Sequence, residues 1–329
     1  MIKKISIVST IILGLIFLIP KEASQSWGFY GHKRINRMAV FTLPPQMVTF
    51  YKKHIEFITN HAVDPDKRRY GVEGEAPRHY IDIDHYGEHA FDSVPKFWKQ
   101  AIAKYTEDTL MAYGIVPWQI EKHYYKLVNA FKDENLDKIL HYSADLGHYI
   151  ADAHVPLHTT ENYNGQLTGQ RGIHGFWESR IPELKAEDYD YFVGRAKYVD
   201  SPIKTAWKVV YDSHMGVDSV LKFEAMLNKE FPEDQKYAYE NRGNVMTKVY
   251  SLEYTNRYDL KIKGQVERRM RESIITVGSL WYTAWVNAGK PNLEKLGEKD
   301  ISDSLRMQLQ KEEELYLLQK NQAVKGHED

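Results

Sequence analysis

Histidines and acidic residues recur at helical spacing in residues 141–178 of this 329-residue chain. His148 lies four residues before Asp152, and His174 lies four residues before Glu178. Residues four apart share one face of an α-helix, so each pair can bind a metal ion. Nitrogen and oxygen ligands without a thiolate are typical of hydrolytic zinc sites, which leave a coordination position open for water. The two pairs therefore predict metal-dependent hydrolysis.

The spacing of these pairs is weak support by itself. The composition predicts roughly two His-x-x-x-acid pairs by chance. Four occur, at His141 and Asp145, His148 and Asp152, His174 and Glu178, and His214 and Asp218. His158 strengthens the prediction, because Pro156 ends the preceding helix and lets the chain turn His158 back toward the interior. The alternative is that these residues are scattered polar groups, although burying so many charges without a metal is costly.

The first 26 residues have the pattern of a secretory signal peptide. Lys3 and Lys4 precede an apolar run over residues 5–19, and Ser24 and Ser26 lie just before Trp27. The run is short for a membrane span, which needs about 20 residues, and an uncleaved anchor is the alternative. Cleavage would free the α-amino group of Trp27 as a metal ligand. We expect a secreted or periplasmic protein without a transmembrane anchor after processing.

The composition limits the partners. The chain has no cysteine, which excludes disulfides and lipoprotein attachment. Its formal net charge is −1, and about −3 once the three lysines and one glutamate of residues 1–26 are removed. Proteins that bind duplex nucleic acid nonspecifically usually have a basic stripe. A phosphate-containing substrate must therefore be held locally, by metal or by a few basic side chains, and the sequence identifies no stable protein partner.

Helical periodicity dominates the segments that must position these ligands. Apolar residues recur three and four apart in residues 35–39, 50–58, 120–131 and 139–150, and another apolar helix is predicted over about residues 274–286. Gly165, Gly169 and Gly172 mark a loop between the two ligand-bearing helices. Strand signals are sparse. We expect an all-α fold, a single multi-helix bundle domain over residues 27–294 with a charged, solvated helical tail over residues 295–329.

Nine residues together resemble the metal ligands of a known superfamily. In chain order they are Trp27, His32, Asp64, His79, His148, Asp152, His158, His174 and Glu178. The set is similar to that of the trinuclear zinc superfamily, which contains the single-strand nucleases of the S-one/P-one type and the bacterial zinc-dependent phospholipases C. The match spans most of the mature chain. It implies the phospholipase C/nuclease type of helical bundle, with a trinuclear metal site.

The resemblance also implies how three zinc ions would be bound. One would take Asp64, His79, His148 and Asp152, a second His158, His174 and Glu178, and a third Trp27, His32 and Asp152. Asp152 would then bridge two ions. The implied reaction is phosphodiester hydrolysis by a metal-activated water. Asp64 would orient that water, and Lys67 would supply a positive charge to the phosphate, without the bidentate contact of the arginine that nucleases often have at this place.

The choice of substrate depends on a few positions. Glu178 is closer to the phospholipases, since nucleases usually have Asp there, whereas the short step from Trp27 to His32 is nuclease-like. Tyr80 and Asp82 occupy places that in the nucleases stack on a base and bind its edge. We expect an endonuclease that cleaves single-stranded DNA or RNA. A zinc-dependent phospholipase C acting on a phospholipid is the alternative, and a non-catalytic secreted zinc-binding protein is a third option.

Overall fold

The computed structural model describes residues 27–242 and 245–319. These residues are mostly helical, and the strands among them form one two-stranded hairpin. The expectation of an all-α fold is confirmed at this level. Within these ranges, no helix combines the length and the apolar character that a membrane span requires. The predicted signal peptide, residues 1–26, lies outside the described residues.

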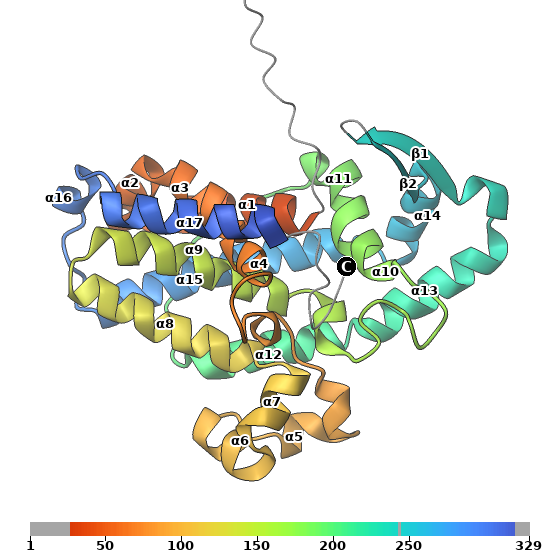
Figure 1. The fold of residues 1–329 in the computed structure, drawn as a ribbon, viewed down its shortest axis with the longest axis horizontal. Helices are drawn as coiled ribbons and strands as arrows, with labels where there is room; N and C mark the ends of the chain where they lie inside the picture. The colour runs from red at the N-terminus through yellow and green to blue at the C-terminus, as the bar shows by residue number, and fades with distance from the viewer. Residues whose placement is uncertain (1–26, 243–244, 320–329) are drawn as a thin grey trace, which may run out of the picture.

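Helix α9 lies at the centre of the fold (Figure 1). The long helices in contact here are α9 (Leu136–Ala153), α8 (Val116–Lys132), α15 (Gln265–Asn287) and α1 (Trp27–Ala39). Asn135 caps α9 by accepting a hydrogen bond from the backbone N–H of Lys138. Every residue from Ser143 to Ala153 is buried. A helix buried on all sides belongs to the interior, so the ionisable residues of this stretch face protein instead of water.

Other helices surround this centre. Those before α8 are α2 (Pro45–Lys53), α3 (Ile55–Asn60), α4 (Asp64–Arg68), α5 (Ala90–Ser93), α6 (Trp98–Tyr105) and α7 (Glu107–Tyr113). Those after α9 are α10 (Ile173–Gly175), α11 (Ile181–Lys185), α12 (Pro202–His214), α13 (Val217–Glu230) and α14 (Leu252–Lys261). The predicted glycine loop lies between α9 and α10, where Gly165, Gly169 and Gly172 have φ angles of 69°, 74° and 91°.

The hairpin is an element that the sequence analysis did not predict. Strand β1 (Tyr237–Arg242) pairs antiparallel with β2 (Val245–Tyr250). Tyr250 stacks on Phe176, with ring centroids 3.9 Å apart. Arg180 donates a hydrogen bond from Nε to the carbonyl oxygen of Tyr250. The hairpin therefore packs directly against the segment that carries Glu178.

The described part of the predicted tail, residues 295–319, is helical and mostly exposed, but it also packs against the rest of the fold. Helix α16 (Glu294–Gly297) contacts α2, and α17 (Asp303–Gln319) lies along α4 (Figure 1). Leu305 and Tyr316 of α17 are buried. The reason is that a few apolar residues on one side of a charged helix suffice to dock it, while its glutamates form ion pairs with α4.

Candidate metal centre

Helix α9 brings His148 and Asp152 together on one face. The Nε2 atom of His148 lies 3.1 Å from Oδ2 of Asp152. His79 follows a short 3-10 turn at Ala76–Arg78. Its Nδ1 atom lies 3.0 Å from Nε2 of His148 and 2.9 Å from Oδ2 of Asp152. Donor atoms that bind one zinc at about 2.0–2.1 Å in a tetrahedron lie roughly 3.3 Å apart. These three residues can therefore bind a single metal ion.

The carboxylate of α4 that faces this group is that of Asp66, whereas Asp64 is the ligand that the resemblance implies. Oδ1 of Asp66 lies 3.6 Å from Nδ1 of His79 and 3.6 Å from Nε2 of His148. Asp64 instead places Oδ2 2.7 Å from Nδ1 of His61. Both aspartates lie on the short helix α4, but two residues of helix turn the side chain by about 200°. Only one of them can therefore face His79 and His148.

His32 approaches the same group from α1. Its Nε2 atom lies 3.2 Å from Oδ1 of Asp152, and its ring stacks on that of His148 with centroids 3.9 Å apart. The two carboxylate oxygens of Asp152 thus face different histidines, as a bridging carboxylate would. Trp27 begins α1. Its predicted role as a ligand depends on cleavage after residue 26, outside the described residues.

A second group consists of His158, His174 and Glu178. Oε2 of Glu178 lies 3.1 Å from Nε2 of His174 and 3.4 Å from Nε2 of His158. Glu178 lies in a π-helical segment, Phe176–Arg180, directly after α10. Such segments are frequent at functional sites. Nδ1 of His158 lies 3.8 Å from Oδ1 of Asp152, so the two groups are neighbours.

Backbone carbonyls fix the orientation of two of these imidazoles. Nδ1 of His148 donates to the carbonyl oxygen of Ala62 at 2.8 Å, and Nδ1 of His158 donates to that of His79, also at 2.8 Å. Each bond leaves Nε2 directed at its metal-binding group. This arrangement is typical of metal-ligating histidines, whose second nitrogen is held by a hydrogen bond.

Burial and neighbouring charges shift the pKa values of these groups strongly. Burial by itself raises the pKa of Asp152, but His148 and His32 outweigh it and hold that pKa well below its usual value. Burial lowers the pKa of His148, whereas Asp152 and Asp66 raise it, with a net value of about 9. For His79 burial dominates and lowers the pKa. A metal ion that binds to these buried histidines and carboxylates would displace the protons that they hold.

Lys67 and Arg69, which follow Asp66, have different neighbours. Nζ of Lys67, the predicted phosphate contact, lies 2.5 Å from Oε2 of Glu313 and 3.7 Å from Oδ1 of Asp64. Its charge is therefore already paired with carboxylates. Nη1 of Arg69 lies 3.9 Å from Oδ1 of Asp66. Arg69 follows Asp66 by three residues, the same spacing that separates Lys67 from Asp64.

The two predicted substrate contacts are both covered by protein. Tyr80 is only 5% exposed, and its ring packs against Gly114, whose missing β-carbon makes room for it. Asp82 is 7% exposed. Burial, with Asp84 and Glu161 nearby, raises the pKa of Asp82 to about 8. Tyr80 in this conformation presents no ring face on which a base could stack.

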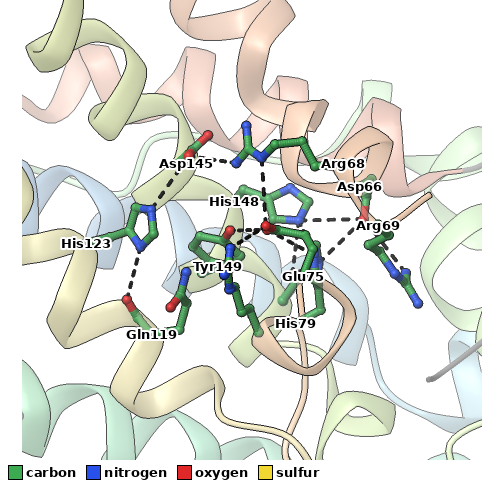
Figure 2. A network of polar contacts seen from close by, with 12 residues as sticks. Asp66, Arg68, Arg69, Glu75, His79, Gln119, His123, Asp145, His148 and Tyr149 are labelled. Atoms are coloured by element: carbon green, nitrogen blue, oxygen red, sulfur yellow. Dashed lines mark hydrogen bonds and ion pairs between the residues drawn. The ribbon is translucent and has the colours of Figure 1, made fainter. Parts of the chain in front are cut away.

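A buried polar network lies behind the first group and was only partly predicted (Figure 2). It includes His141 and Asp145, one of the four pairs with helical spacing, and Nε2 of His141 lies 3.5 Å from Oδ2 of Asp145. Arg68 donates to that same oxygen at 2.7 Å. Glu75 was not predicted, and its Oε1 lies 3.8 Å from Nε2 of His79. The sequence offered no clear signal for Glu75, because one glutamate in a loop resembles any surface acid.

Comparison with protein-family models and with curated proteins finds no match to this chain. The chemistry of the site is therefore inferred from its own residues. Buried histidines and carboxylates with donor atoms about 3 Å apart can bind several divalent cations close together.

Proposed function

We propose that this protein is a zinc-dependent phosphodiester hydrolase. The observation that carries the proposal is the position of Asp152, whose Oδ2 faces His79 and His148 while its Oδ1 faces His32. A carboxylate shared in this way brings two cations close together. Bound zinc supplies Lewis acidity, which makes water a nucleophile near neutral pH and neutralises charge on a phosphate.

Three zinc ions are proposed, as the resemblance implies, with one change of ligand. The proposed sets are Asp66, His79, His148 and Asp152, then His158, His174 and Glu178, and finally Trp27, His32 and Asp152. Asp66 replaces Asp64 because its carboxylate is the one that faces His79 and His148. Nitrogen and oxygen donors without thiolate suit zinc in a hydrolytic site.

The chain supplies orientation and charge around these ions. Asp66 is the carboxylate placed to orient a water, because it lies at the edge of the first group and keeps a second oxygen. Arg69 is the cation placed beside Asp66, whereas Lys67 is paired with Glu313. An arginine can bind two phosphate oxygens at once. We therefore assign the phosphate contact to Arg69 in preference to Lys67.

For the substrate, the resemblance favours single-stranded DNA or RNA cleaved internally. Binding of an unstacked base would require Tyr80 to turn out of its buried position, since stacking needs an open ring face. That requirement keeps a phospholipase C activity as the second candidate. The exposed apolar side chains of the hairpin, Tyr239, Val245 and Met246, favour contact with a lipid surface.

A paired assay separates these functions. The mature zinc-loaded protein is given single-stranded DNA, single-stranded RNA, phosphatidylcholine vesicles and a small chromogenic phosphodiester, with Asp152→Ala as the inactive control. Hydrolysis of the small diester that Asp152→Ala abolishes would support the proposal. Faster cleavage of phosphatidylcholine than of either nucleic acid would select the second candidate. Zinc binding with no hydrolysis of any substrate would leave the non-catalytic zinc-binding protein.

A further inference from the structure

The C-terminal helix α17 is anchored at both of its ends, and its second half packs next to α1 and α4. Leu305 is buried near its start, where Ser302 N–H donates to Oδ1 of Asp137 at 3.0 Å. Near its end, Tyr316 packs between two aromatic rings, 6.3 Å from Phe29 and 5.5 Å from Tyr70 between centroids. The second half of the helix is thus held on α1, which carries His32, and on Tyr70, just after the helix α4 that carries Asp66.

Two consecutive glutamates of α17 meet two consecutive cations of α4. Oε2 of Glu313 lies 2.5 Å from Nζ of Lys67, and Oε2 of Glu312 lies 3.5 Å from Nη1 of Arg68. The side chains of Lys67, Arg68 and Glu312 are all less than one-fifth exposed, at 19%, 11% and 19%. Glu313 is 44% exposed, so the pair of Glu312 with Arg68 is the more sheltered of the two and is screened by solvent less than a pair on the open surface.

Arg68 continues these contacts into the protein interior (Figure 2). Its Nη2 donates to Asp145 at 2.7 Å, and its Nε lies 3.9 Å from Oε2 of Glu75. Oε1 of Glu75 in turn lies 3.8 Å from Nε2 of His79 and accepts a hydrogen bond from the hydroxyl of Tyr149. A continuous set of contacts therefore joins α17 to a metal-binding histidine.

The glutamates of α17 change the charge next to Asp66. Asp66 is followed directly by Lys67 and Arg68, and it must hold its carboxylate toward His79 and His148. Unpaired cations next to a metal ligand would compete for its carboxylate and repel a divalent ion. Glu313 is the nearest carboxylate to Lys67, and Glu312 adds to the negative charge that Asp145 and Glu75 already place around Arg68.

We propose that α17 is a positioning element of the metal centre, acting through Glu312 and Glu313 on Lys67 and Arg68. Through Lys67 and Arg68 it sets the position of Asp66, and through Arg68 and Glu75 that of His79. Neither glutamate touches the metal-binding groups. The inference rests on the proposed function only in that the first group binds zinc.

The test compares zinc affinity in full-length mature variants. Glu312→Gln combined with Glu313→Gln keeps size and helical propensity but removes both charges. We expect about tenfold weaker zinc binding in a competition titration, the lower end of the range for residues that support metal ligands. Cobalt(II) bound in place of zinc should show an altered visible spectrum, which a purely structural contact would leave unchanged.

Two controls make the result specific. Glu314→Gln removes a charge from the exposed side of the same helix, where Glu314 contacts Gln310, and should keep wild-type affinity. Glu312→Asp with Glu313→Asp keeps both charges and should recover most of the lost affinity. Circular dichroism checks that each variant folds.

The outcomes separate this inference from the proposed function. If the folded double glutamine variant binds zinc within twofold of wild type, or Glu314→Gln loses as much affinity, α17 has no positioning role. Wild-type protein that binds no zinc would contradict the proposed function itself. Wild-type protein that binds zinc and hydrolyses phosphodiesters, with unaffected variants, would contradict only the role of α17.

Discussion

The side chain of Asn36 on α1 occupies the space that a β-carbon at Gly147 on α9 would need. Asn36 is fully buried, and its Nδ2 donates to the carbonyl oxygen of Ala144 at 3.0 Å. Gly147 immediately precedes His148, and α1 also carries His32. This contact therefore sets how closely the two helices approach and allows the rings of His32 and His148 to stack.

Gly147→Ala should destabilise the protein by about 1–3 kcal/mol, because the added methyl forces Asn36 out of its site. Denaturant unfolding measures the loss. Gly175→Ala is the matched control, since a β-carbon there meets nothing within 4 Å. Equal stability of the two variants would show that α1 can move away from α9 at little cost.

Asp66→Asn and Asp64→Asn should differ in metal content. Asp66 faces His79 and His148, so its loss should weaken zinc binding about 10- to 100-fold, whereas Asp64→Asn removes a contact with His61 and should keep the zinc. Elemental analysis after dialysis against a weak chelator measures both variants. The reverse result would restore Asp64 as the ligand.

Removal of zinc should destabilise the fold as well as abolish hydrolysis. The residues proposed to bind zinc come from α1, α4, the turn before His79, α9 and the segments around α10, so bound ions would hold separate elements together. Zinc at about 100 times its dissociation constant would add roughly 2.7 kcal/mol of stability, and chelation should lower the melting temperature by roughly 5–10 °C. Elemental analysis should approach three zinc ions per mature chain. An unchanged melting temperature after complete chelation would argue against metal at these groups.

Asp82→Asn should stabilise the protein at alkaline pH. The pKa of Asp82 in the folded protein is raised from its usual value to about 8. The folded state therefore favours the protonated carboxyl, and this contribution to stability is lost as the pH rises from about 4 through 8. Asparagine resembles the protonated acid and avoids that loss. We expect a melting temperature roughly 2–4 °C above wild type at pH 9, about 1 kcal/mol, and no gain at pH 4. Exposed Asp92→Asn serves as the control, and a gain that is the same at both pH values would contradict this explanation.

The mature protein should begin at Trp27, as mass spectrometry of the exported protein can establish. The free α-amino group is the proposed ligand that joins His32 and Asp152 at one ion, so one additional N-terminal residue should cost about one zinc per chain. Full activity and full zinc content in a protein that begins elsewhere would exclude this role for Trp27.

The sequence determined those parts of the site that lie within single helices. His148 with Asp152, and His174 with Glu178, are each four residues apart, and helical geometry alone places such pairs together. The sequence also predicted the turn at Pro156 that brings His158 back toward the interior, because proline ends a helix whatever surrounds it. The all-α class followed from periodicity in the same way.

Only the tertiary structure decided which residues from different elements meet. The resemblance indicated Asp64, whereas the packing of the short helix α4 turns the carboxylate of Asp66 toward His79 and His148. Tyr80 is as apt as any aromatic residue for base stacking until its contact with Gly114 buries it. The docking of α17 depends on a few apolar residues, which its mostly charged sequence does not single out. In each case local periodicity defines the faces of an element, whereas the partner of each face depends on long-range packing that one sequence does not encode in any short pattern.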